Sequence, residues 1–382
     1  MAERLAPSVP HLLVDARSLN GARNGITRFV EQLVAAWPEA PGFRTTLISN
    51  RPIRSNATLP TSVACLHDTH QLSLLPGTLW MTLRVPALAR QLGATHFLGT
   101  EHVLPLWRTG RLTQGVIVHD LVFKLFPGTM ATSNRLLTGF FAPRSIRRAD
   151  RIFCVSETTR TDLRYHFGST TADALVCYPG RTTISSDGVA FPGSIDLTLD
   201  RGAGIRLLVV GSMEPRKNVA RFLEAFLLAA DQAPQLRLDL VSGDAWGNVL
   251  GENTWAKVRQ HPRVRIHRRI SDQVLLSLYN AADYLVFPSL YEGFGLPLLE
   301  AVGHCAVLAN DIPVFREIAG QIDGVHLMNL QAEPVAIAAH LVALVDINPP
   351  KPADDRGKFS WNQCASRILA GLDLPAPALR VA

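Results

Sequence analysis

Residues 282–320 read ADYLVFPSLYEGFGLPLLEAVGHCAVLANDIPVFREIAG, and this stretch indicates most directly how the chain folds. Its apolar run 284–287 predicts a buried strand, and a loop with a Gly-Phe-Gly turn then leads into a helix that has Pro297 at its start. Proline is favoured there because a helix does not use its first N–H group. A strand, a glycine turn and a helix N-terminus in succession present backbone N–H groups to anions. Two carboxylates, Glu292 and Glu300, stand on either side of the turn.

The segment from Glu292 to Glu300, EGFGLPLLE, resembles the E-x7-E signature of retaining, nucleotide-sugar-dependent glycosyltransferases of family 4. The resemblance implies the GT-B fold, an α/β architecture in which two Rossmann-like domains face each other across a cleft and a C-terminal helix returns to the first domain. It also implies that Glu292 is the catalytic carboxylate facing the sugar and that Glu300 holds the ribose hydroxyls. The spacing alone shows one carboxylate in a loop and another early in a helix, where the dipole favours an acid.

The glycine turn itself supplies further candidate contacts to the donor. The backbone N–H groups of Phe294, Gly295 and Leu296 can donate to sugar hydroxyls or to phosphate, because glycine removes side-chain bulk there.

Length and composition predict two domains. At 382 residues and 47% hydrophobic composition, the chain exceeds the usual limit for one core. A stretch rich in Gly, Pro, Ser and Asp follows Tyr178 and is the best linker candidate. We therefore expect an acceptor-binding domain at 1–195, a donor-binding domain at 196–356 and a returning helix at 357–382. No leader-like segment and no long apolar run is present, which favours a cytoplasmic protein, peripheral on the inner face of the membrane.

The formal net charge of +6 lies entirely in the first half of the chain, where residues 1–200 hold 20 Lys and Arg against 14 Asp and Glu. Such a surplus fits an anionic membrane, a phosphorylated acceptor, nucleic acid or a solvated surface without a partner. The arginines between Arg144 and Arg151 stand near apolar Leu136 and Phe140, as in a helix on a membrane surface. The same helix also needs an apolar face for its own core. Beyond this charge, nothing favours nucleic acid, and we expect none as a partner.

The first domain begins with a strand, a glycine loop and a helix. The segment DARSLNGARNGITRF is close to the version of this loop in bacterial mannosyl- and rhamnosyltransferases. That resemblance implies that Gly25 lets the backbone approach a donor phosphate. Arg28 lies in the first helical turn, where a cation opposes the dipole unless an anion is near. Gly21 and Gly25 do not form a dinucleotide fingerprint, so a tight turn is the alternative.

A second candidate in this domain follows the apolar strand GVIVHD, which ends in His119 and Asp120. Ligands of open α/β sheets bind beyond the carboxyl ends of strands. Adjacent strand residues point to opposite faces, so one of the two is expected to face the ligand. The family resemblance favours His119, which would contact the transferred sugar. A structural histidine is the alternative.

The second domain opens with a buried strand and the loop GSMEPRKN. Arg216 and Lys217 follow the strand and precede a helix, where two cations are unfavourable unless an anion binds. The loop resembles the G-x-x-x-x-R-K motif of family 4, in which the basic pair grips the donor diphosphate. In the same family, the segment that matches HRRI passes the nucleotide base, which implies Arg269 and Ile270 as further donor contacts.

No Asp-x-Asp occurs in the chain, so we expect neither a metal nor another cofactor, and the cations would balance the leaving diphosphate. The resemblance favours GDP-mannose as donor, with dTDP-rhamnose or a UDP-hexose as alternatives, and a lipid-linked or polysaccharide acceptor. The competing class is a non-catalytic nucleotide-sugar-binding protein of the same fold. Five scattered cysteines without a CxxC pair predict reduced, buried thiols.

Overall fold

The computed structural model describes residues 9–20, 24–39, 42–55, 57–107, 111–130, 132–181, 204–242, 250–347 and 358–376. The chain divides into two compact units. The first comprises Met1–Gly180 and Phe359–Ala382, and the second comprises Arg181–Lys358. The predicted borders at 195/196 and 356/357 fall outside the described residues.

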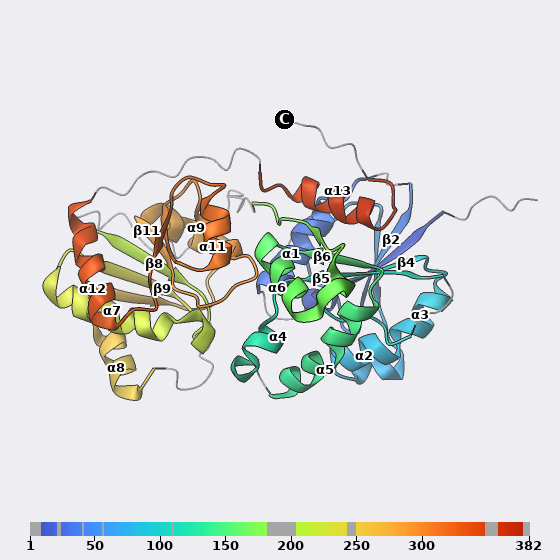
Figure 1. Cartoon of the computed structure of the whole chain (residues 1–382), viewed down its shortest axis with the longest axis horizontal. Helices are drawn as coiled ribbons and strands as arrows, with labels where there is room; N and C mark the ends of the chain where they lie inside the picture. The colour runs from blue at the N-terminus through green and yellow to red at the C-terminus, as the bar shows by residue number, and fades with distance from the viewer. Residues whose placement is uncertain are drawn as a thin grey trace, which may run out of the picture. The chain divides into compact units, whose positions relative to one another are not determined.

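The first unit is built on a parallel sheet in the order β3-β2-β1-β4-β5-β6-β7, with helices packed on it (Figure 1). Its strands are β1 (His11–Asp15), β2 (Arg44–Ser49), β3 (Val63–His67), β4 (His96–Gly99), β5 (Thr113–Val118), β6 (Arg151–Cys154) and β7 (Leu175–Val176). Its helices are α1 (Gly25–Ala35), α2 (Gly77–Leu83), α3 (Val85–Gln91), α4 (Val122–Leu125), α5 (Thr132–Arg148), α6 (Glu157–Phe167) and α13 (Trp361–Gly371).

The C-terminal helix α13 belongs to the first unit, as predicted. The rings of Phe29 on α1 and Trp361 on α13 meet edge to face at 5.3 Å. Arg367 on α13 donates a 3.1 Å hydrogen bond to the carbonyl of Val176, the last residue of β7. The helix therefore completes a core that the chain began more than three hundred residues earlier.

The second unit is built on a parallel sheet in the order β10-β9-β8-β11-β12-β13. Its strands are β8 (Arg206–Val210), β9 (Arg237–Val241), β10 (Val264–His267), β11 (Tyr284–Phe287), β12 (Ala306–Asn310) and β13 (Val325–Met328). Its helices are α7 (Val219–Gln232), α8 (Glu252–Gln260), α9 (Asp272–Ala281), α10 (Leu296–Ala301), α11 (Pro313–Ala319) and α12 (Pro334–Ala343). Helices α7 and α12 cover one face, where apolar residues of both pack on alternate positions of the strands.

Each sheet has one point at which the strand order reverses direction. In the first unit it lies between β1 and β4, and in the second between β8 and β11. Parallel strands end at the same edge of a sheet, and in open α/β sheets ligands bind at this switch point. The loops that follow these four strands are therefore the places to look for a site.

One detail differs from the sequence-based expectation. Cys65 is exposed, so the prediction of buried thiols is wrong for this residue, although all five cysteines are unpaired and the other four are buried. The difference arises because β3 is the edge strand of the sheet, with only one neighbouring strand to cover it. Among the described residues, no helix combines the length and the apolar composition that crossing a bilayer requires.

Candidate active site

The basic pair lies in the loop after β8. Arg216 and Lys217 occupy a short 3-10 turn, Pro215–Lys217, and Asn218 follows with a left-handed φ of 54° directly before α7. The carbonyl of Arg216 accepts a 2.8 Å hydrogen bond from the backbone N–H of Leu290, which follows β11. This hydrogen bond connects the two loops of the second switch point. Arg216 and Lys217 lie between a strand and a helix, as the sequence predicted.

Glu292 joins this pair directly. Its Oε1 accepts a 2.5 Å hydrogen bond from Nζ of Lys217, and its Oε2 lies 3.3 Å from Nη1 of Arg216. Arg216 also donates to the carbonyl of Tyr291 at 2.7 Å, and its Nη2 lies 3.4 Å from the carboxylate of Glu214. Carboxylates of the chain itself therefore stand where the sequence predicted a need for an anion.

The charges of this cluster determine the state of Glu292, which is 9% exposed. Burial alone would raise the pKa of its carboxyl group, but the charges of Lys217 and Arg216 outweigh burial and hold the pKa below its ordinary value. Glu292 is therefore an anion at neutral pH. A fixed negative charge beside two cations can stabilise positive and negative charge that develop on neighbouring atoms.

The glycine turn is shaped by packing as well as by conformation. Gly295 has a φ of 100°, and a Cβ atom there would lie 2.9 Å from ring atoms of both Phe287 and Phe315. Phe294 is buried, and Leu296 is half-buried as the first residue of α10. No other residue fits position 295 without strain, so the turn requires glycine. Donor contacts from these three N–H groups stay a prediction.

Glu300 has a different hydrogen-bond partner from Glu292. It is the fifth residue of the six-residue α10 and is 4% exposed. The hydroxyl of Tyr279, a fully buried residue of α9, donates to its Oε2 at 3.3 Å. Tyr279 was not among the residues predicted from the sequence. Its signal was a tyrosine on the apolar face of a helix, because a buried phenol hydroxyl generally finds a partner.

Arg269 and Ile270 lie in the turn between β10, which is the edge strand of the sheet, and α9. Arg269 is exposed and adopts a left-handed φ of 51°, while Ile270 is half-buried. Strained backbone of this kind often marks ligand sites. Two strands, β9 and β8, separate this turn from β11 in the sheet, so no direct contact with Glu292 is expected, and their role with the base stays a prediction.

In the first unit, His119 follows β5, and its imidazole ring is held by a hydrogen bond and by ring contacts. Its Nε2 lies 2.8 Å from the carbonyl of Thr100, and its ring meets those of Phe29 and His102 edge to face at 4.8 and 5.5 Å. Burial, reinforced by the neighbouring His102, lowers the pKa of His119 to about 4. The imidazole is therefore neutral at physiological pH, with Nε2 as donor to the carbonyl and Nδ1 as acceptor.

The remaining candidates of this unit are less constrained. Gly25 is exposed at the first position of α1, and a Cβ atom there would meet nothing within 4 Å, so packing does not require glycine. Asn24 caps the helix by accepting from Thr27 N at 3.0 Å, and Arg28 is half-buried one turn in. Asp120 accepts a 3.0 Å hydrogen bond from the N–H of Val122, which gives it a structural role at the start of α4.

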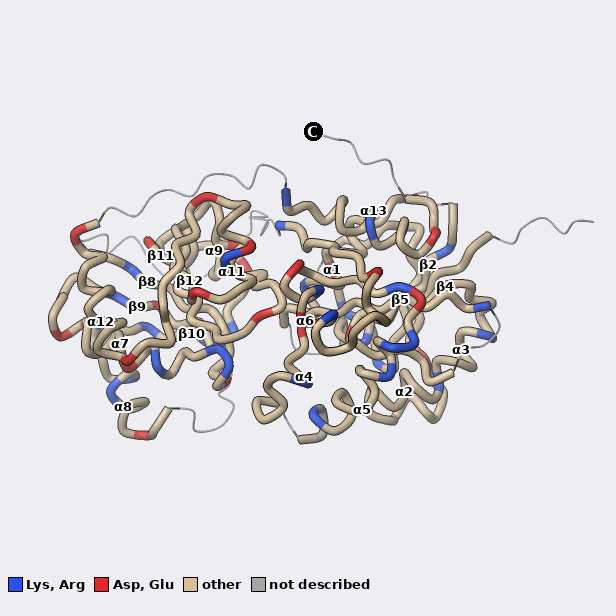
Figure 2. Tube along the Cα trace, viewed as in Figure 1, with Lys and Arg blue, Asp and Glu red and all other residues tan. Residues whose placement is uncertain are grey.

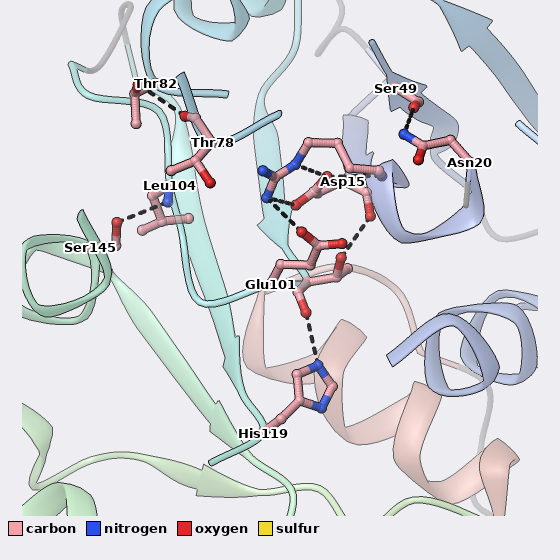
Figure 3. A network of polar contacts seen from close by, with 11 residues as sticks. Asp15, Asn20, Ser49, Thr78, Thr82, Glu101, Leu104, His119 and Ser145 are labelled. Carbon is pink, nitrogen blue, oxygen red and sulfur yellow. Dashed lines mark hydrogen bonds and ion pairs between the residues drawn. The ribbon is translucent and has the colours of Figure 1, made fainter. Parts of the chain in front are cut away.

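A buried ionic network at the first switch point was also missed by the sequence analysis (Figure 3). Arg17 donates to both carboxylate oxygens of Asp15 at 2.9 and 2.8 Å and lies 3.3 Å from Glu101. Thr100 donates to the carbonyl of Asp15 at 2.8 Å and accepts from His119. The end of β1 is thereby connected through β4 to the end of β5. Asp15 and Arg17, two residues apart at the end of the first strand, were its only signal.

Comparison with known proteins now bears on the second unit. Residues 204–346 match the sequence family described as Glycosyl transferases group 1. These residues form a group 1 glycosyltransferase domain. The cluster of Arg216, Lys217 and Glu292 lies within this domain, and so does Glu300. Its boundaries enclose all six strands of the second sheet.

Relatives that match part of the chain are bacterial mannosyltransferases. The chain is 35% identical over 182 residues to the serotype-specific mannosyltransferase WbdA of Escherichia coli, a match that covers 45% of this chain and 22% of WbdA. It is 33% identical over 177 residues to O-antigen chain mannosyltransferase B of Escherichia coli, covering 42% of this chain and 44% of that protein. The matched regions thus span about a fifth and less than half of these relatives' own lengths.

The fold outside the group 1 domain has matches among solved structures. Sucrose-phosphate synthase from Thermosynechococcus elongatus superposes with a TM-score of 0.68 at 19% identity, covering 94% of this chain and 97% of that one. At this identity the likeness shows the fold alone. The GT-B fold, two Rossmann-like units with parallel sheets, is therefore confirmed for the chain.

Proposed function

We propose that this chain is a retaining, metal-independent glycosyltransferase of family 4 that moves a mannosyl group from GDP-mannose to a lipid-linked or polysaccharide acceptor. One observation carries the proposal, namely the cluster of Arg216, Lys217 and Glu292 at the switch point of a group 1 glycosyltransferase domain. It unites two cations with an ionised carboxylate at the place where ligands of such sheets bind. The mannosyl group is proposed because WbdA and O-antigen chain mannosyltransferase B carry that activity in their names.

The charges of the cluster match those that develop when a sugar–diphosphate bond breaks. Negative charge accumulates on the leaving diphosphate, and Arg216 and Lys217 would stabilise it through charge-assisted hydrogen bonds. Positive charge develops at the anomeric carbon, and the carboxylate of Glu292 would face it. Because two side chains supply the cationic charge, the reaction would need no metal ion.

The other candidate residues would complete the donor site. Glu300, held by Tyr279, would accept hydrogen bonds from the ribose hydroxyls. Neutral His119 would offer Nδ1 to a hydroxyl of the transferred sugar, because Nε2 is occupied by Thr100. Gly25 and Arg28 are proposed as further donor contacts.

We propose front-face transfer as the route to retention. The acceptor hydroxyl would approach from the side of the departing diphosphate, whose phosphate oxygen would take its proton. No residue of the cluster needs to form a covalent intermediate, since Glu292 is engaged by two cations and serves as a fixed charge.

The decisive test is a transfer assay with purified full-length protein. GDP-mannose, dTDP-rhamnose and UDP-glucose would be supplied with a mannose-terminated lipid-linked acceptor, with and without excess EDTA, and the product anomer determined by NMR. We expect transfer from GDP-mannose with the α-anomer retained and EDTA without effect. Transfer from another donor, an inverted product or loss of activity in EDTA would each overturn the corresponding part of the proposal.

A non-catalytic nucleotide-sugar-binding protein is the second candidate. The ion pairs of Glu292 favour it, because a carboxylate engaged by two cations can serve to hold two loops together. This candidate expects calorimetric binding of GDP-mannose without hydrolysis or transfer. Turnover with any acceptor excludes it.

We further propose that helix α5 brings the protein to an anionic membrane on the cytoplasmic side, where the acceptor would be anchored. Leu136 and Phe140 are 65% and 50% exposed and stand one turn apart. Arg144, one turn further, stacks its guanidinium carbon 3.5 Å from the Phe140 ring centroid. Arg135 and Arg147 are exposed on the same helix, and Figure 2 shows the basic positions at both of its ends. Apolar side chains bordered by arginines suit the interface of acidic lipids.

A further inference from the structure

The switch point of the first sheet carries charged groups to which the proposed donor site gives no role. β1 and β4 are neighbours there, and their ends place Asp15 beside Glu101 (Figure 3). Arg17 lies between the two carboxylates, and its side chain is 5% exposed, whereas 27% of the Glu101 side chain is exposed. Asp15 is buried and pairs with Arg17 in the interior of the unit, whereas the carboxylate of Glu101 is partly exposed to solvent.

The next residue, His102, has an unusual backbone. Its φ of 62° lies in the left-handed region, which is unfavourable for a residue with a side chain. Residues held in such conformations occur preferentially at ligand sites, where the surrounding structure enforces them. The fold therefore maintains His102 in one orientation at an energetic cost.

The side chain of His102 is also incompletely satisfied. The residue is 8% exposed, and its Nδ1 is buried without a hydrogen-bond partner among the described residues. Its ring meets those of His119 and Phe123 edge to face at 5.5 and 5.9 Å. A buried polar atom of this kind is costly unless a ligand or water completes it.

The surroundings restrict which ligand fits. The carboxylates of Glu101 and Asp120 disfavour an anion, Asp15 and Arg17 neutralise one another, and no group of His, Cys, Asp and Glu among the described residues could hold a metal ion. Burial raises the pKa of Glu101 and lowers the pKa of His102, so the buried surroundings disfavour the charged form of both groups. A neutral ligand with hydroxyl groups, which both donate and accept, suits a carboxylate and an imidazole side by side.

We propose that Glu101 and His102 bind hydroxyl groups of a carbohydrate substrate at the switch point of the first unit, beside His119. This inference rests on the proposed function and extends it to residues that the family signature does not include. Glu101 accepts from one hydroxyl, and the imidazole of His102 bonds a second, with the ring of Phe123 beside it. The sugar is that of the donor or that of the acceptor, and kinetics distinguish the two sources.

The test uses the full-length variants Glu101→Gln and His102→Asn. Glutamine keeps the shape of Glu101, and Arg17 stays paired because Asp15 binds it with both oxygens. Asparagine tolerates the left-handed backbone better than most residues. Glu39→Gln and His96→Asn are matched controls, since Glu39 is exposed and His96 lies at the opposite, amino end of β4.

We expect each variant to raise KM for one sugar substrate about tenfold, as the loss of a hydrogen bond to a charged or buried group does, with the other KM and Tm unchanged. The affected substrate identifies the source of the sugar. A carboxylate that serves only as partner of Arg17 would lower Tm and leave both KM values intact, and that result overturns the proposal. Both controls should behave as the wild type.

A binding measurement separates this proposal from the proposed function. Saturation-transfer NMR with methyl α-D-mannopyranoside reports sugar binding without turnover. Binding that is weakened in both variants supports the site even if the wild type transfers nothing, in which case only the proposed function fails. Transfer that is intact in both variants leaves the function standing and removes this site. Absence of both transfer and binding in the wild type overturns both.

Discussion

Nζ of Lys217 lies 2.5 Å from Oε1 of Glu292, although 75 positions separate the two residues in the chain. The pair forms because Lys217 follows β8 and Glu292 follows β11, and these strands are neighbours at the switch point. The carboxylate thus already offsets one of the two positive charges before any diphosphate arrives. The diphosphate of a donor must then displace Glu292 from Lys217 and Arg216 or bind these two cations together with it.

Glu292→Gln should lower kcat by about 100-fold or more, because it removes a charge proposed to stabilise the transition state. Affinity for GDP should be unchanged or higher, since the variant removes a competitor for Lys217 and Arg216. Unfolding free energy should fall by about 1–3 kcal/mol, the usual cost of leaving buried polar groups unsatisfied. Kinetics, calorimetry with GDP and urea denaturation measure the three effects.

The matched control is Glu214→Gln, which removes a carboxylate from the same arginine without touching Lys217. It should keep nearly full kcat. Wild-type turnover by Glu292→Gln would exclude the residue from the chemistry.

The double variant Arg216→Ala with Lys217→Ala should bind GDP at least about tenfold more weakly, because charge-assisted contacts to phosphate are among the stronger hydrogen bonds. Arg221→Ala provides a control in the first turn of α7, where the arginine donates to the carbonyls of residues 331 and 332. Titration calorimetry in low salt measures both. Equal loss of affinity in the two variants would indicate a general effect of charge on binding.

Tyr279→Phe should weaken donor binding about threefold to tenfold by removing the hydrogen bond that orients Glu300. GDP and its 2′-deoxy form should differ in affinity for the wild type and differ less for the variant, since the ribose contact depends on Glu300. Tyr165→Phe, at a tyrosine that is 83% exposed, is the control. An unchanged difference between the two nucleotides would show that Tyr279 has a packing role only.

Stability should fall as the pH drops from about 6.5 towards 4, partly because of His119. Its pKa is lowered from 6.5 to about 4 in the folded chain, so in this window the unfolded state binds the proton and the folded state does not. His119→Gln should therefore make the urea midpoint less dependent on pH between 7 and 5. His340→Gln, at an exposed position of α12, should retain the wild-type slope. Equal slopes in all three proteins would contradict a buried, neutral His119.

The double variant Leu136→Ser with Phe140→Ser should reduce sedimentation of the protein with phosphatidylglycerol vesicles several-fold, since both side chains are proposed to enter the interface. Binding by the wild type should weaken as salt is raised, because the arginines of α5 attract acidic lipid. Leu74→Ser, at a leucine that is 86% exposed elsewhere in the unit, should bind as the wild type. Wild-type binding by the double variant would dismiss α5 as the docking helix.

Local patterns in the sequence were sufficient for the elements and for part of the site. The apolar spacing of residues 25–35 and 219–232 predicted α1 and α7, because burying one face of a helix leaves a repeat in the sequence. The motif from Glu292 to Glu300 and the pair Arg216 and Lys217 were recognisable because the glycine turn and the strand-to-helix junction are local as well. Family membership of residues 204–346 agrees with them.

Only the tertiary structure decided which of these groups meet. Strand order brings Lys217 to Glu292 and Glu101 to Arg17, and helix packing brings Tyr279 to Glu300. Hydrophobic periodicity indicates which face of a helix or strand is buried, but it does not indicate which other element packs on that face. Partners far apart in the chain therefore leave no local signal. The sequence by itself determined the two Rossmann-like units and the chemistry available to them, whereas the order of the parallel strands determined that the EGFGLPLLE turn faces its cations.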